Sequence, residues 1–142
     1  YDREDCWMTY GSYIEYPSNV RGKFSQKVPD HIIDGNLFRS SPWMTSHLRT
    51  WKYGLWKGID KQKSFVEKDP VDNENHYAFC WDLAYMFPLL ELAGTKSYYI
   101  SDILYVYNRQ NPLCCDKIKH DVQLKMEHKI RNMERYKPLE EI

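Results

Sequence analysis

The stretch CWDLAYMFPLLELAG, residues 80–94, is apolar at nearly every position. Its length suits a helix, and a helix that is apolar on all sides is buried in a protein core. Gly94 is a typical C-terminal stop, because glycine adopts unusual backbone angles at low cost. We expect Pro88 to kink this helix or to end its first part, since proline has no backbone N–H.

Two carboxylates interrupt this apolar stretch, Asp82 beside Trp81 and Glu91 near the end. A buried carboxylate without a partner is costly, or it takes up a proton. Asp82 therefore caps the helix start, pairs with a buried cation, or lines a pocket as a general base near a reacting hydroxyl. The residues alone favour a structural role, although cap and base are compatible. We predict that Glu91 lies at the surface.

The segments before the apolar stretch carry weaker patterns. Residues 6–16 are rich in aromatic and β-branched side chains, which predicts extended structure interrupted at Gly11. Residues 17–43 are predicted to be mostly loop. Residues 60–75 are charged and polar, which predicts an exposed linker. Between them, residues 45–59 have apolar side chains at helical spacing, which predicts an amphipathic helix with the stripe Leu48, Trp51, Leu55 and Ile59.

After the apolar stretch, residues 97–100 and 103–108 predict two short strands or one bent strand. Residues 117–133 predict a helix with one narrow apolar stripe on a charged surface, capped by Asp116. We therefore divide the chain into a main part, 1–112, and a C-terminal amphipathic helix with its tail, 113–142.

Three helices and a few short strands are too few for a self-sufficient parallel sheet. The element order predicts the second half of an α/β domain whose first half is absent, and the chain begins at Tyr1 rather than Met. The 20 basic and 20 acidic residues balance, so a uniformly basic nucleic-acid surface is not expected. No apolar run is long enough for a membrane span.

Four cysteines show neither a C-x-x-C pair nor a disulfide framework, which predicts reduced thiols in the cytoplasm and no zinc site. Aromatic residues are abundant, with 12 Tyr, 5 Trp and 5 Phe. They suit either ordinary packing or stacking against sugar rings, and composition alone favours packing.

The string WDLAYMFPLLELAGTKSYYISDILYVYNRQNP, residues 81–112, resembles the C-terminal half of family 2 glycosyltransferases of the GT-A fold. There an acid, usually one of a pair, opens a helix that ends in glycine, and a strand with a Leu-Tyr-x-Tyr-Arg motif follows. The upstream strings CWMTYGSYIEYP and SPWMTSHLRTWKYGLW also resemble segments of a subgroup. Those places are filled by Asp82, Gly94, Ile100, Leu104, Tyr105 and Tyr107.

The resemblance implies an inverting glycosyltransferase with Asp82 as the general base. This carboxylate would take the proton from an acceptor hydroxyl as that oxygen attacks the anomeric carbon of a nucleotide-sugar. The implied partners are the nucleotide-sugar donor and a glycan or other hydroxyl acceptor. The implied cofactor is a divalent cation, Mg or Mn, with ligands mostly outside this chain.

The resemblance also suggests substrate-binding residues. Trp81 replaces the first acid of the usual pair and either stacks on the acceptor or merely packs. Where some members carry a histidine, this chain has Asn108 and Arg109; Arg109 either reaches the diphosphate or is a solvated surface arginine.

Four further candidates lie in or just before the predicted helix over 45–59. Trp43, before the predicted helix, is either a platform for the acceptor or a hydrophobic staple. Ser46 either lies near the donor phosphates or the acceptor, or caps the helix. His47 and Arg49 lie off the apolar stripe of 45–59 and face either a cleft or solvent.

The family binds its donor through an N-terminal half that ends in an Asp-x-Asp motif, which has no counterpart here. We therefore expect this chain alone to be inactive, and its exposed apolar face to allow self-association. Two alternatives stay open. The chain is a non-catalytic carbohydrate-binding or interaction module in which Asp82 only caps a helix, or it is a small α/β domain of another enzyme class.

Overall fold

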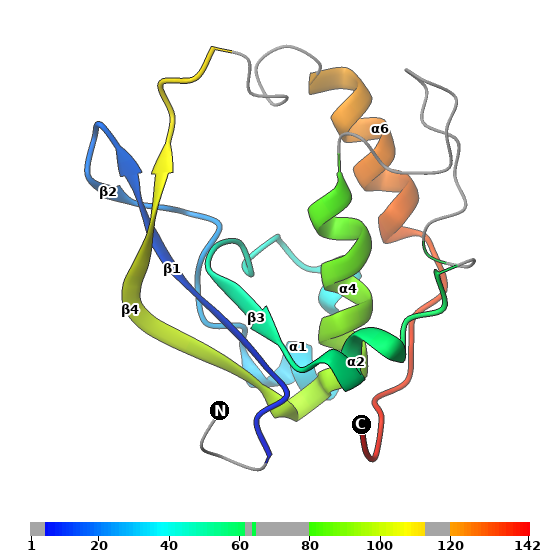
Figure 1. Ribbon diagram of the computed structural model, residues 1–142. Helices are drawn as coiled ribbons and strands as arrows, with labels where there is room; N and C mark the ends of the chain where they lie inside the picture. Colours follow the sequence, from blue (N-terminus) through cyan, green and yellow to red (C-terminus); the bar gives the residue numbers. More distant parts are fainter. Residues whose placement is uncertain (1–4, 62–63, 65–79, 113–119) are drawn as a thin grey trace.

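The computed structural model describes residues 5–61, 64, 80–112 and 120–142. This part of the protein is mixed α/β, with a four-stranded mixed sheet facing a buried helix (Figure 1). The predicted cap Asp116, two of the cysteines and most of the predicted linker over 60–75 lie outside the described residues.

Strand β1 (Met8–Tyr16) pairs with each of the other three strands. Strands β2 (Val20–Arg21) and β3 (Arg49–Trp51) are antiparallel to it, and β4 (Ser97–Asn108) runs parallel along its whole length. The predicted interruption at Gly11 is wrong. A Cβ at Gly11 would lie 3.3 Å from the Ile100 carbonyl oxygen, so glycine keeps β1 and β4 close here.

The predicted strands at 97–100 and 103–108 form the single strand β4, whose register with β1 shifts between Gly11 and Tyr13. One of the two sequence-based alternatives, a single strand, is therefore confirmed. The extra β4 residues at the shift account for the break between the two apolar runs in the sequence.

The predicted helix over 45–59 is wrong. Thr45 pairs with Ser25 in an isolated bridge, β3 follows, and only Tyr53–Lys57 form a helix, α2. The apolar spacing imitates a helix because Trp51 of β3, Leu55 of α2 and Ile59 after α2 all pack against the same core. Pairing of β3 with β1 satisfies the backbone groups that a helix would otherwise have satisfied.

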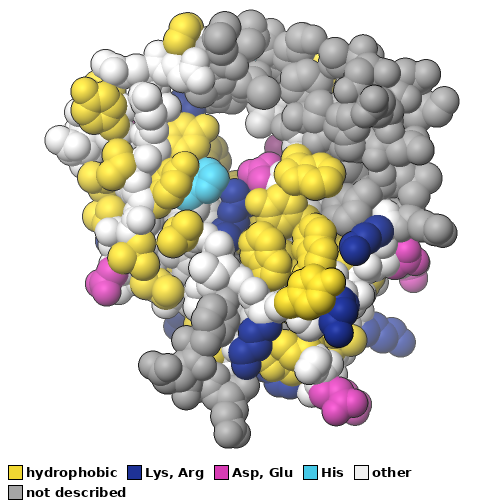
Figure 2. Space-filling model, in the orientation of Figure 1, with side chains coloured by type: hydrophobic (Ala, Val, Ile, Leu, Met, Phe, Trp, Pro, Cys, Tyr) yellow, Lys and Arg dark blue, Asp and Glu magenta, His cyan; other side chains and the backbone are white. Residues whose placement is uncertain are grey.

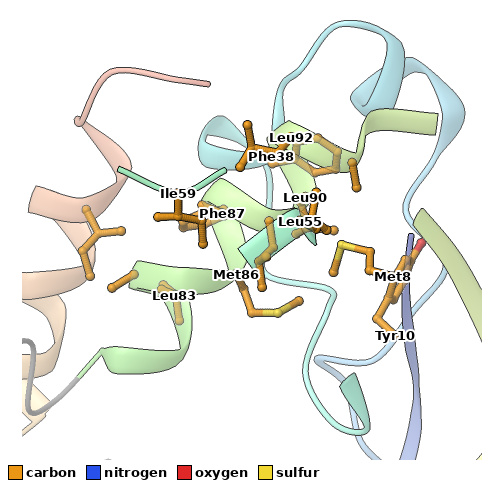
Figure 3. Close-up of a cluster of buried hydrophobic side chains, with 14 of the residues drawn as sticks. Met8, Tyr10, Phe38, Leu55, Ile59, Leu83, Met86, Phe87, Leu90 and Leu92 are labelled. Carbon is orange, nitrogen blue, oxygen red and sulfur yellow. The ribbon is translucent and has the colours of Figure 1, made fainter. Parts of the chain in front are cut away.

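Helix α4 (Trp81–Ala93) is the buried helix that the sequence predicts. Gly94 ends it with φ of +52°, a backbone angle that favours glycine. Of the two alternatives for Pro88, an end of the helix at this residue is wrong, because α4 runs through it. Figure 3 shows the cluster in which Met86, Phe87 and Leu90 of α4 meet side chains of the sheet and of α2.

Glu91 is fully buried, so its predicted surface position is wrong. Its carboxylate accepts two hydrogen bonds from Arg39, at 2.6 Å from Nε and 2.9 Å from Nη2. The remaining Nη1 of Arg39 donates to the Ile130 carbonyl at 2.6 Å, and the Tyr136 backbone N–H donates to Glu91 at 3.1 Å. This buried pair therefore joins α4 to the C-terminal part of the chain.

The remaining elements pack around α4. Helix α6 (His120–Arg131) buries Met126 and Ile130, as its predicted apolar stripe requires. The other short elements are α1 (Asp30–Asp34), η1 (Phe38–Ser40) and η2 (Gly94–Lys96). Within the described ranges, no helix has the length and apolar character needed to cross a membrane.

Candidate functional site

Asp82 lies in the first turn of α4. This N-terminal end of the helix lies on the side of β3 and of the C-terminal part of β4. The N-cap position is Cys80, whose side chain makes no capping bond. The predicted capping contact is present in part, because the backbone N–H groups of Asp82 and Leu83 in this first turn favour the ionised form of the Asp82 carboxylate. The Asp82 side chain is 40% exposed, and the carboxylate is nevertheless desolvated by the surrounding protein. This partial burial raises the pKa of Asp82, and the nearby Arg49 guanidinium opposes the rise.

Arg49 reaches the carboxylate from β3, and its side chain is only 7% exposed. Its guanidinium lies over the ring of Tyr85 at 5.5 Å, and its Nη2 lies 3.3 Å from Nδ1 of His47. Nη1 is 3.8 Å from Asp82 Oδ2, which is an ion pair but too long for a hydrogen bond. Among the described residues, this buried Nη1 has no hydrogen-bond partner.

The distance between Arg49 Nη1 and Asp82 Oδ2 allows one hydroxyl oxygen to bond to both atoms. An oxygen about 2.8 Å from each of two atoms that are 3.8 Å apart lies to one side of the line between them, and it reaches the buried Nη1 only if the side chains around this atom move. It would accept from the guanidinium and donate its proton to the carboxylate. The two side chains can therefore orient a hydroxyl and remove its proton.

His47 lies on the other side of Arg49, within a stack of tyrosine rings. Its ring centroid is 4.7 Å from that of Tyr105 and 5.5 Å from that of Tyr107, while Tyr13 meets it edge-on at 6.1 Å. Burial and the adjacent Arg49 lower the pKa of His47 to about 4. The ring is therefore neutral at pH 7, and Nδ1 accepts the N–H of Arg49, which can only donate.

Figure 2 shows a hollow between the side formed by β1 and β4 and the side formed by α4, with a histidine, a basic and an acidic side chain on its walls. Four sequence-predicted residues are brought together by the contacts given above and by the adjacent positions of Trp81 and Asp82 in α4: Asp82, Trp81, Arg49 and His47. They join because β3 and the first turn of α4 meet, which the wrongly predicted helix over 45–59 could not have indicated.

The other predicted site residues lie elsewhere or at the margin. Trp43 packs edge-on against Phe87 at 5.5 Å, and Ser46 is buried with its backbone N–H bonded to Phe24. Asn108 is exposed at the end of β4, where its side chain accepts a bond from the Gln110 backbone. Arg109 lies 5.7 Å from the Tyr107 ring and thus borders the stack around His47.

The sequence reasoning missed three aromatic side chains near Asp82: Tyr85 contacts Trp81, and Trp51 and Trp56 contact Tyr85. Tyr85 follows Trp81 by one helical turn, a spacing that was available as a signal. Trp51 was assigned to the core stripe of a helix that does not form, and Trp56 was not singled out at all, because its contact with Trp51 depends on how β3 and α2 follow one another.

A separate opening of about 480 Å³ lies between α1 and the start of β4, lined by Tyr10, Asp30, Asp34 and Tyr99 among others. Asp82, Arg49 and His47 do not line it. Within the described residues, no three His, Cys, Asp or Glu side chains gather as a metal site. The sequence matches no protein-family model, and searches of curated proteins and of solved structures found no match either.

Proposed function

We propose that this chain is the acceptor-side part of an inverting, family 2-like glycosyltransferase of the GT-A fold. The observation that carries the proposal is the pairing of a partly exposed carboxylate, Asp82, with a buried arginine whose Nη1 lacks a hydrogen-bond partner among the described residues. In this reaction Asp82 accepts the proton of the acceptor hydroxyl while that oxygen bonds to the anomeric carbon of the donor sugar.

Arg49 has the role of holding both the base and the acceptor. Its charge favours the ionised form of Asp82, which is the form that can take a proton. Its Nη1 would hold the acceptor oxygen at the carboxylate, so that the oxygen and its base stay aligned. The leaving diphosphate departs from the opposite face of the donor sugar, so an arginine beside the base belongs to the acceptor side.

In the proposed reaction, a divalent cation would be bound by residues outside the group around Asp82. The Arg49 guanidinium, 3.8 Å from Asp82, would repel a metal ion placed on that carboxylate. No cluster of three potential ligands occurs in the described part of the chain. The residues around Asp82 therefore do not fit a metal site, and the role of Asp82 as a base needs none.

Two further observations support parts of the proposal. Cys6 and Cys80 are buried free thiols, which suits the reducing cytoplasm. The half-exposed aromatic rings beside Asp82 suit a sugar, because the C–H faces of sugars lie well on aromatic faces. The same rings would also suit a binding module without catalysis, which is the second candidate function.

A transfer assay on the full-length protein separates these two candidates. The protein is incubated with a panel of nucleotide-sugars and oligosaccharides, and both the released nucleoside diphosphate and the anomeric configuration of the product are measured. We expect release with one donor and a product of inverted configuration. A retained configuration would contradict Asp82 as a base, while glycan binding without release from any donor would support the module.

A further inference from the structure

Four aromatic side chains form a continuous strip that starts beside Asp82. We define the aromatic strip as Trp81, Tyr85, Trp51 and Trp56. Trp81 meets Tyr85 edge-on at 6.3 Å, and Tyr85 lies 5.5 Å from Trp51 and 6.4 Å from Trp56. Trp51 and Trp56 stack at 6.2 Å. Figure 2 shows a continuous group of hydrophobic side chains on this side of the hollow, reaching down towards α2.

Packing of the core explains only part of the strip. Tyr85, Trp51 and Trp56 are partly buried against the core, so one side of each ring has a structural role. Trp81 is 45% exposed at the start of α4 and adds little to that core. Single exposed aromatic residues are common at protein surfaces, so what suggests a ligand is that Trp81 continues a group of four contacting rings, and not its exposure alone.

Polar groups border the strip at both ends. Asp82 and Arg49 lie at the α4 end, where Arg49 also covers Tyr85. At the α2 end, the Lys61 ammonium lies 5.8 Å from the Trp56 ring. Aromatic faces with hydrogen-bonding groups at their rim are the combination that a sugar chain requires, since each sugar ring has an apolar face and a hydroxyl edge.

We propose that the aromatic strip binds an oligosaccharide chain, whose end next to Trp81 presents its hydroxyl to Asp82. This inference rests on the proposed function and adds the class of acceptor to it. A single sugar beside Asp82 would contact Trp81, the exposed ring of the strip, so Trp56 would contribute only when further sugars follow.

The test uses binding and therefore needs no activity. Tryptophan fluorescence of the full-length protein is titrated with gluco-, manno-, galacto- and N-acetylglucosamine oligosaccharides, from disaccharide to hexasaccharide. We expect affinity to rise with chain length in one series. Trp81→Ala should weaken every member of that series about tenfold, the effect of one lost aromatic contact. Trp56→Ala should weaken only the longer members.

The matched control is Tyr53→Ala, because Tyr53 is 71% exposed and lies outside the strip. This variant should bind every oligosaccharide of the series with the affinity of the parent. Circular dichroism checks that each of the three variants is folded. Absence of binding to every series, or a Trp56→Ala loss that is the same for short and long chains, would overturn the proposal. If Trp56→Ala misfolds, the comparison of oligosaccharide affinity between Trp81→Ala and Tyr53→Ala tests the proposal: equal affinities would overturn it.

The outcome is separable from that of the proposed function. Length-dependent binding that depends on Trp56, together with failure of every transfer assay, would support the strip and contradict the enzyme. Inverting transfer whose KM for acceptor is unchanged by Trp81→Ala and Trp56→Ala would support the enzyme and contradict the strip.

Discussion

At the scale of single residues, three side chains from two segments define the site. Asp82 has a raised pKa, His47 has a lowered pKa, and Arg49 lies between them with one partner on each side. Perturbed pKa values of this kind gather at functional sites more often than elsewhere. Because His47 is neutral at pH 7, its contact with Arg49 is a hydrogen bond, whereas Asp82 forms an ion pair with Arg49.

The lowered pKa of His47 predicts a pH-dependent stability. The unfolded histidine takes up a proton near pH 6.5, whereas the folded one does so only at about 4. Between these values the unfolded state binds more protons, so the free energy of unfolding should decrease as pH falls from about 6.5 to about 4. Urea denaturation at pH 7 and pH 5 measures this decrease.

The decrease should be smaller in His47→Gln, which removes the titrating ring. The control His120→Gln changes an exposed histidine at the start of α6 and should keep the decrease of the parent. An equal decrease in His47→Gln and the parent would show that His47 does not titrate in this way.

At the scale of elements, the sequence predicted α4 and β4 well, and it predicted β3 badly. The apolar length of 80–94 and the stop at Gly94 define α4 without help from the rest of the protein. The segment 45–59 has helical spacing, yet its pairing with β1 is a long-range effect that no local pattern carries. The pairing of β3 with β1 therefore places Arg49, and His47 just before the strand, near Asp82.

Glu91 illustrates the same limit for a single position on α4. Its acidic side chain near a helix end looked like a surface residue, and nothing near it in sequence indicates its partner. Arg39 lies far away in the chain, in η1, and reaches Glu91 only after the core has formed. The apolar neighbours of Asp82 favoured a structural role, and only the resemblance suggested Asp82 as a base. Arg49 was also a candidate, but no local pattern indicated that it lies 3.8 Å from Asp82.

We predict that Glu91→Gln destabilises the protein strongly, because it leaves the buried Arg39 charge uncompensated. The expected loss in the free energy of unfolding is about 3–5 kcal/mol. The control Glu127→Gln breaks an i,i+4 pair with Arg131 near the surface, and should lose less than about 1 kcal/mol. Urea denaturation of both variants measures the difference, and equal losses would contradict a structural role for the Arg39–Glu91 pair.

At the scale of the whole molecule, one helix connects stability with the proposed chemistry. The body of α4 packs in the core and carries Glu91, while its first turn carries the exposed Trp81 and places Asp82 beside Arg49. The rigid core thus holds the candidate base against β3, which carries Arg49. Sites built on packed elements keep their geometry better than sites built on loops.

The most direct test of the proposed function is sugar transfer by Asp82→Asn in the full-length protein. The amide keeps the shape of the side chain but cannot accept the proton, so kcat should fall by about 10²- to 10⁴-fold while donor binding is unchanged. The control Asp102→Asn changes an exposed carboxylate on β4 and should transfer at the parental rate. Transfer by Asp82→Asn at a rate close to that of Asp102→Asn would contradict the assignment of Asp82 as the base.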